Sequence, residues 1–139
     1  MTRWTVGLLA VLAVLLAACG TGAPQPGAFP QNADGYADVS VAQLAALLEK
    51  EDVTLVNVHV PYEGEIPETD LFLPYDQIAG HLDQLPDKEA PIVLYCRSGG
   101  MSTSAAQELA GLGYGNVLEL DGGFQAWEAA GYELLDEER

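Results

Sequence analysis

"LYCRSGGMSTSAAQELAGLG", residues 94–113, joins an apolar run to a segment of helical spacing through a loop that contains two glycines. The apolar run begins at Pro91 and stops at Cys96, as expected of a short buried strand. We predict a helix at residues 102–112, ended by Gly113. The sequence therefore puts a cysteine between a strand and a helix, where the active sites of parallel α/β sheets lie.

Strands and helices alternate along the sequence after residue 35. Apolar and β-branched runs predict strands, and helical spacing of apolar residues predicts helices. The predicted strands are residues 52–60, 71–73, 91–95 and 116–120, and the predicted helices are residues 41–50, 74–82, 102–112 and 124–130. Ser40 and Gln43 match a capping box at the start of the first helix. The alternation predicts an α/β fold class, with a small parallel β-sheet flanked by helices on both faces.

The composition limits the functions that the chain can have. Its 139 residues are enough for one domain, and a hydrophobic content of 49% is typical of a folded protein. With 21 acidic against 5 basic residues the chain repels phosphate backbones, so we expect no nucleic-acid partner. Two histidines and no cysteine cluster do not have the spacing of a metal site, and we expect no metal and no cofactor.

The first 35 residues differ from the rest of the chain. Residues 1–18 combine one positive charge with an uncharged apolar run too short to span a bilayer, which is typical of a secretory signal. The run ends in Leu-Ala-Ala-Cys-Gly, which resembles a bacterial lipobox and implies cleavage before Cys19 and lipidation of its thiol. An ordinary signal peptide with a chance cysteine is the alternative. We therefore predict a flexible tether at residues 19–35, a folded domain at residues 36–139, and a membrane-anchored lipoprotein outside the cytoplasm.

Cys96 would then be the only thiol free to react, with no partner for an internal disulfide. The loop behind it contains Gly99 and Gly100, which allow several N–H groups to converge on one centre, and the next helix adds its own unpaired N–H groups. Arg97 adds a full positive charge. We expect a thiol in this place to ionise more readily than a free thiol and to act as a nucleophile, although a buried structural role is commoner for a lone cysteine.

Two motifs resemble those of rhodanese-like domains, a sulfurtransferase family. They are YCRSGGMS, residues 95–102, which is similar to the active-site loop, and VLELDGGFQAWEAAGYEL, residues 117–134, which is similar to the C-terminal signature. The resemblance extends over about residues 36–135. It implies that Cys96 takes sulfane sulfur from a donor as a persulfide and passes it to a thiol or to cyanide. The implied persulfide cradle consists of Arg97, Ser98, Gly99, Gly100, Met101 and Ser102.

Loop composition distinguishes this chemistry from that of related cysteine enzymes. A cysteine phosphatase or arsenate reductase needs an arginine six or seven residues after its nucleophile, where this chain has Ser102 and Thr103. Many thiosulfate-using members of the rhodanese family carry a basic residue five positions after the cysteine, and here that residue is Met101. The resemblance therefore implies a sulfur donor that is bulkier or less charged than thiosulfate.

The segment Asn57-Val58-His59 departs from the Asp-x-Arg that the family carries at the end of its second strand. We interpret Asn57 and His59 as a neutral replacement of an ion pair. The alternative is that His59 lies near the Cys96 loop and modulates its proton affinity.

Together these features predict a bacterial, extracytoplasmic, membrane-anchored sulfurtransferase that acts on a small-molecule or protein sulfur donor. We expect it to be a monomer. The alternative is a rhodanese-like module that carries a persulfide or docks a partner without turnover. Met101 and the altered segment at residues 57–59 keep this alternative open.

Overall fold

The computed structural model describes residues 29–50 and 53–136. The predicted signal peptide, Cys19 and the first part of the predicted tether lie outside these residues. In chain order the elements are β1 (Ala37–Val39), α1 (Val41–Leu48), β2 (Thr54–Asn57), β3 (Leu71–Phe72), the 3₁₀ helix η1 (Ile78–Gln84), β4 (Ile92–Tyr95), α2 (Gly100–Gly111), β5 (Val117–Leu120) and α3 (Gly123–Ala129). Within the described ranges, no helix combines the length and the apolar character that crossing a membrane requires.

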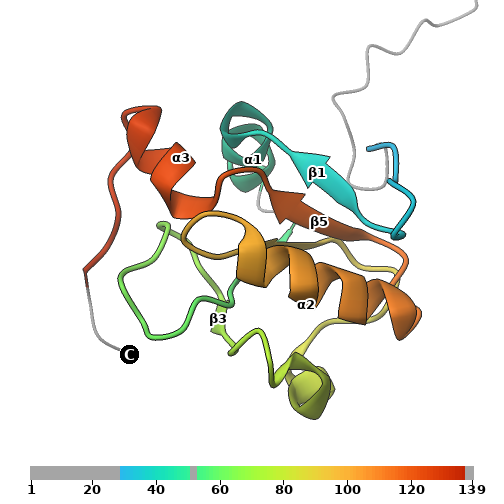
Figure 1. The fold of residues 1–139 in the computed structure, drawn as a ribbon. Helices are drawn as coiled ribbons and strands as arrows, with labels where there is room; N and C mark the ends of the chain where they lie inside the picture. The colour runs from blue at the N-terminus through green and yellow to red at the C-terminus, as the bar shows by residue number, and fades with distance from the viewer. Residues whose placement is uncertain (1–28, 51–52, 137–139) are drawn as a thin grey trace, which may run out of the picture.

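The strands form one five-stranded sheet in the order β1-β5-β4-β2-β3, and every neighbouring pair is parallel (Figure 1). On one face, Val93 and Leu118 of the sheet pack with apolar residues of α1 and α3. On the other face, Ile92 and Leu94 pack with apolar residues of α2 and η1. This arrangement confirms the predicted α/β fold class, a small parallel sheet with helices on both faces.

The central strand β4 decides on which face the cysteine lies. Ile92 and Leu94 point to the face that α2 covers, while Val93 and Tyr95 point to the face that α1 and α3 cover. Cys96 continues the alternation and belongs to the cluster on the α2 side, because successive side chains of a strand point to opposite faces. Since β4 and β5 are parallel neighbours, the loops that leave their carboxyl ends meet at one edge of the sheet.

The first helix begins as predicted. The Gln43 N–H donates to Ser40 Oγ at 3.3 Å, and the Ser40 N–H donates to Gln43 Oε1 at 2.8 Å, so the capping box is confirmed. Most other predicted elements are present, with ends that differ by a few residues. Of the strand predicted at residues 52–60, residue 52 lies outside the described residues, and the strand observed is Thr54–Asn57. It ends where the Asn57 side chain bonds to the following loop.

Two segments differ in kind from the prediction. The prediction of a helix at residues 74–82 is wrong. The segment begins with turns and continues as the 3₁₀ helix η1, in which His81 has a non-helical φ of −124°. Gly80 precedes this break and lowers the helix propensity of the segment. Strand β1 was not predicted, since Ala37–Val39 is three residues long with a central Asp38. It forms because β5 offers it a parallel edge to pair with.

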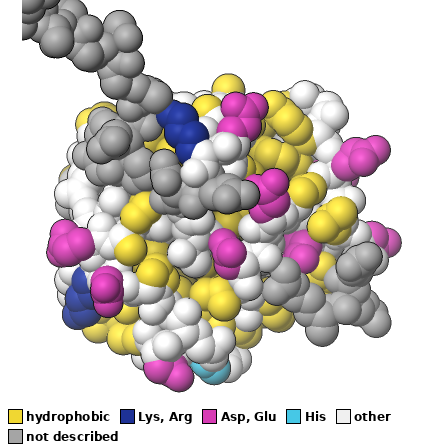
Figure 2. Space-filling view, turned by 180° about the vertical axis from the view of Figure 1, so that it is seen from behind, with side chains coloured by type: hydrophobic (Ala, Val, Ile, Leu, Met, Phe, Trp, Pro, Cys, Tyr) yellow, Lys and Arg dark blue, Asp and Glu magenta, His cyan; other side chains and the backbone are white. Residues whose placement is uncertain are grey.

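The surface is strongly acidic, as the composition requires. On the face seen in Figure 2, Asp and Glu side chains are spread among hydrophobic and neutral groups, and Lys or Arg side chains are few. The carboxylates exposed on this face remain solvated. Two carboxyl groups of the described residues are buried instead, those of Glu65 (5% exposed) and of Glu119 in β5 (2% exposed).

Candidate active site

Cys96 directly follows β4 and is 2% exposed. The main-chain N–H of Gly99 donates to its Sγ at 3.1 Å, and the hydroxyl of Ser102 lies within donating distance of the same atom at 3.3 Å. Hydrogen-bond donors held around a sulfur atom stabilise a negative charge on it. Two donors from the following loop and helix therefore converge on this thiol.

The turn of the loop depends on Gly99. Its φ of +108° lies in the left-handed region that side chains rarely adopt, and its carbonyl oxygen accepts the Thr103 N–H at 2.9 Å to start α2. The turn makes the helix begin at Gly100, two residues before the predicted start. Met101 and Ser102 consequently belong to the first turn of α2, and the loop between strand and helix is shorter than the sequence suggested.

A cavity of about 360 Å³ opens beside the sulfur. Its lining residues come from the Cys96 loop, from α2 and from two segments earlier in the chain, and are His59, Tyr75, Cys96, Arg97, Ser98, Gly100, Met101 and Ser104. The structure thus brings most of the predicted cradle to one cavity, together with the predicted modulator His59. Gly99 and Ser102 hold the sulfur without lining the cavity. The sequence did not mark Tyr75 as a cavity residue, since it shows only an aromatic residue after a proline.

One carboxylate joins the charged groups at the cavity edge. Glu63 Oε2 lies 2.9 Å from His59 Nε2 and accepts a hydrogen bond from an Arg97 guanidinium nitrogen at 3.3 Å. His59 also packs edge-on against the ring of Phe124, with ring centroids 5.6 Å apart. The positive charge of Arg97 is therefore partly compensated before any substrate arrives.

Asn57 does not reach the cavity. Its side-chain amide donates to the Gly64 carbonyl at 3.1 Å, and its Oδ1 accepts the His59 N–H at 3.0 Å. Both bonds are local and neutral, and they shape the loop that carries His59 and Glu63. Asn57 is thus a support of the loop rather than part of the cavity wall.

The C-terminal motif, residues 117–134, supports the Cys96 loop through backbone hydrogen bonds. The N–H groups of Phe124 and Gln125, at the start of α3, donate to the carbonyl oxygens of Cys96 and Arg97 at 2.9 and 3.0 Å. A Cβ atom on Gly123 would lie 2.2 Å from the Cys96 oxygen, so only glycine allows this approach. The Gly-Gly turn after β5 therefore fixes the backbone of the Cys96 loop.

Sequence reasoning missed Glu119, the third residue of β5. Its Oε1 forms a short hydrogen bond with the hydroxyl of Ser102, which also faces Cys96 Sγ. Burial raises the pKa of Glu119 from 4.5 to about 7, although the bond from Ser102 opposes the shift. The available signal was an acidic residue inside the apolar run Val-Leu-Glu-Leu, at a position that points toward α2.

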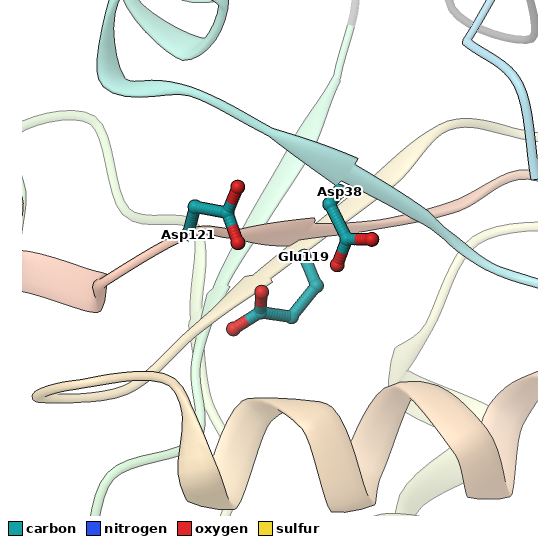
Figure 3. Close-up of side chains that lie close together, drawn as sticks. All are labelled: Asp38, Glu119 and Asp121. Carbon is teal, nitrogen blue, oxygen red and sulfur yellow. The ribbon is translucent and has the colours of Figure 1, made fainter. Parts of the chain in front are cut away.

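Two further carboxyl groups stand beside Glu119. Asp38 is its cross-strand neighbour on β1, and Asp121 follows two residues later, with carboxylate oxygens of all three within 4.8 Å of one another. Figure 3 shows the Glu119 side chain extending from β5 toward α2, with the other two groups around it. Asp38 and Asp121 are exposed, and their negative charges add to the rise in the pKa of Glu119.

Comparison with known proteins agrees with this geometry. A sequence model of the Rhodanese-like domain matches residues 40–130. The chain is 40% identical over 92 residues to a sulfurtransferase of Allochromatium vinosum, covering 64% of this chain and 84% of that protein. It is 36% identical over 104 residues to the thiosulfate sulfurtransferase GlpE of Pseudoalteromonas translucida, covering 73% and 97%.

A solved structure extends the likeness to the fold. The rhodanese-related protein of Thermoplasma volcanium superposes with a TM-score of 0.63 at 24% identity, covering 72% of this chain and 98% of that one. Sequence and fold thus agree over the part of the chain that carries both motifs. The two relatives named above are sulfurtransferases, and the chain belongs to the rhodanese-like domain family.

Proposed function

We propose that the chain is a sulfurtransferase in which Cys96 carries the sulfur as a persulfide. The observation that supports this most directly is the pair of donors on Sγ, from Gly99 and Ser102, at the side of an open cavity. A persulfide places its second sulfur beyond Sγ, and the adjoining cavity offers room for that atom. The N–H groups at the start of α2 and the guanidinium of Arg97 would stabilise its charge.

The reaction divides into two displacements at sulfur. In the first, the Cys96 thiolate attacks the outer sulfur of the donor, a new S–S bond forms, and the donor leaves with the electron pair of its broken bond. In the second, an acceptor thiolate or cyanide attacks the outer sulfur of the persulfide, and Cys96 leaves as the thiolate. Neither step changes the number of electrons overall, and neither requires a metal or a cofactor.

The cavity walls favour a donor of low charge. Arg97 is the one cation among the lining residues, and it already shares Glu63 with His59. Met101 adds an apolar, flexible side chain instead of a second positive charge. A persulfide of an organic thiol fits this wall better than thiosulfate, because its charges are spread over a larger molecule, whereas thiosulfate carries two negative charges on a small ion. Thiosulfate, the substrate in the name of the GlpE relative, is the competing donor.

A turnover assay tests the proposal. The full-length protein would be incubated with glutathione persulfide or thiosulfate as donor, and with cyanide or a thiol as acceptor. We expect turnover with the persulfide, a mass gain of one sulfur atom on Cys96, and loss of both in Cys96→Ser. A sulfur adduct without turnover would favour a carrier module. A Cys96 that stays unmodified with both donors would contradict the proposal and leave a docking module.

We further propose that the protein acts outside the cytoplasm as a lipid-anchored protein. Support comes from residues 1–35 alone, through the apolar run, the cysteine at its end and the tether that follows. Mass spectrometry of the protein from membranes should find acyl chains on Cys19. Cys19→Ala should move the protein out of the membrane fraction, and a protein that stays cytoplasmic with residues 1–18 uncleaved would contradict the assignment.

A further inference from the structure

We propose that Glu119 is a positioning residue that directs the Ser102 hydroxyl either to itself or to the sulfur of Cys96, and in this way controls how reactive the sulfur is. The inference rests on the proposed function in one respect, since it treats Cys96 as the reacting group. Glu119 lies behind the Cys96 loop and does not line the cavity, so it acts through Ser102 rather than on a substrate.

The geometry offers Ser102 a choice of acceptors. Its Oγ lies 3.3 Å from Cys96 Sγ and 3.1 Å from the Gly99 carbonyl oxygen, and it is in short contact with Glu119 Oε1. A hydroxyl has one hydrogen to donate, so it cannot satisfy all three acceptors at once. Ser102 is 0% exposed and Glu119 is 2% exposed, so water does not compete for these positions.

The protonation state of Glu119 decides the choice. When Glu119 is protonated, its own O–H donates to Ser102 Oγ, and the serine hydrogen is free to point at Cys96 Sγ. When Glu119 is ionised, the carboxylate accepts the serine hydrogen, and the sulfur loses this donor. The ionised carboxylate also adds a buried negative charge near the sulfur, where water screens it poorly. The first state therefore favours a thiolate or persulfide anion on Cys96, and the second disfavours it.

The surroundings allow both states near neutral pH. Among the titratable groups that face Glu119, β1 contributes Asp38, β5 continues into Asp121, and the end of β4 contributes Cys96 itself. From α2 the contacting side chain is the uncharged Ser102, and the ion pairs found among the described residues do not include Glu119. Burial and these neighbours raise the pKa of Glu119 to about 7, so both forms are populated at physiological pH.

The first test compares Glu119→Gln with the unaltered full-length protein. Glutamine keeps the size of the side chain, donates an N–H to Ser102 at every pH, and so imitates the protonated acid. Alkylation of Cys96 by iodoacetamide would be followed across the pH range. We expect the variant to react at most about twofold faster near pH 7, where about half of the wild type is already protonated at Glu119, and up to about tenfold faster near pH 8. Asp38→Asn is the matched control, because it removes a neighbouring charge that makes no bond to Ser102. It should give no increase, since loss of this charge lowers the pKa of Glu119 and favours the ionised form.

The second test separates the hydrogen bond from simple charge repulsion. In a Ser102→Ala background, Glu119→Gln should lose most of its effect on alkylation. An undiminished effect in this background would mean that charge acts through space, and the positioning role would be refuted. Ser102→Ala alone should slow alkylation below about pH 7 and leave it unchanged above, where the hydroxyl already faces Glu119. A uniform slowing at all pH values would also refute the role, and this single variant suffices should Glu119→Gln fail to fold.

Alkylation does not require sulfur transfer, so the two proposals fail separately. An unaltered protein that shows no turnover, but whose alkylation responds to Glu119→Gln as expected, would refute the sulfurtransferase and retain the positioning role. If the protein shows turnover but its alkylation rate does not change in Glu119→Gln, the positioning role would be refuted and the sulfurtransferase retained.

Discussion

The main-chain N–H of Phe124 donates to the carbonyl oxygen of Cys96 at 2.9 Å, which ties the start of α3 to the loop that holds the cysteine. The two residues are brought together because β4 and β5 are parallel neighbours and end at the same edge of the sheet. The loop therefore does not depend on its own glycines alone for its shape. A second loop, after β5, fixes it through backbone hydrogen bonds to Cys96 and Arg97.

Gly123→Ala should disrupt this support. The added Cβ would lie 2.2 Å from the Cys96 oxygen, and φ of Gly123 is +57°, so backbone must move. We expect a loss of about 3 kcal/mol in the free energy of unfolding, together with slower alkylation of Cys96. Gly111→Ala in α2 is the control, since a Cβ there meets nothing within 4 Å. Equal stability of the two variants in chemical denaturation would contradict the prediction.

Glu119→Gln should change how stability depends on pH. The pKa of Glu119 rises from 4.5 in the unfolded chain to about 7 in the folded protein, so folding favours the protonated acid. The wild-type protein keeps this contribution below about pH 4.5 and loses it progressively as the pH rises through about 7. The variant should therefore match the wild type near pH 4 and exceed it by about 3 kcal/mol near pH 8.

Urea unfolding at several pH values measures the effect of Glu119→Gln. Glu108→Gln, on the exposed side of α2, serves as the comparison and should not alter the pH dependence. A constant offset between wild type and Glu119→Gln at all pH values would mean that the carboxyl does not titrate as the buried environment predicts.

Glu63→Gln should raise kcat/KM for anionic sulfur donors. Glu63 shares one oxygen with Arg97 and His59 at the cavity edge, so its removal leaves the guanidinium charge uncompensated. Because Arg97 and Glu63 are partly exposed, we expect kcat/KM for thiosulfate to rise only about threefold. The gain should shrink at high salt and be absent for an uncharged sulfur donor such as a dialkyl trisulfide. A gain of equal size for both donors would point to a change in the loop rather than in charge.

Met101→Lys should shift donor preference toward thiosulfate. The residue lines the cavity on the first turn of α2, where a lysine adds a positive charge near an incoming anion. We expect kcat/KM for thiosulfate to rise about tenfold relative to that for glutathione persulfide. Met101→Leu keeps the apolar wall and should leave the ratio unchanged. An unchanged ratio in Met101→Lys would remove the basis for a low-charge donor.

His59→Gln should leave the pH midpoint of Cys96 alkylation where it is. The His59 ring lines the cavity, but its Nε2 is engaged with Glu63 and its Nδ1 is buried, which favours a structural role. Alkylation rates measured against pH decide between this interpretation and the alternative. A displaced midpoint would establish His59 as the modulator of the thiol.

The distance along the chain over which a feature acts explains which features could be predicted. The strand at residues 91–95, the capping box at Ser40 and the cysteine after an apolar run are local patterns, and all are present in the structure. Local patterns failed for β1, which is too short to be recognised and is held by its pairing with β5. They also failed at η1, where i→i+3 turns replaced an α-helix.

The amino-acid sequence alone determined that a cysteine follows a buried strand, that two glycines and an arginine come after it, and that strands and helices alternate around it. The tertiary structure decided which groups contact Cys96 and its loop from other parts of the chain. Ser102 meets Glu119, and Cys96 meets Phe124, only because the strand order brings β5 beside β4. The burial that raises the proton affinity of Glu119 comes from packing between elements distant in the chain, and no local run of residues encodes it.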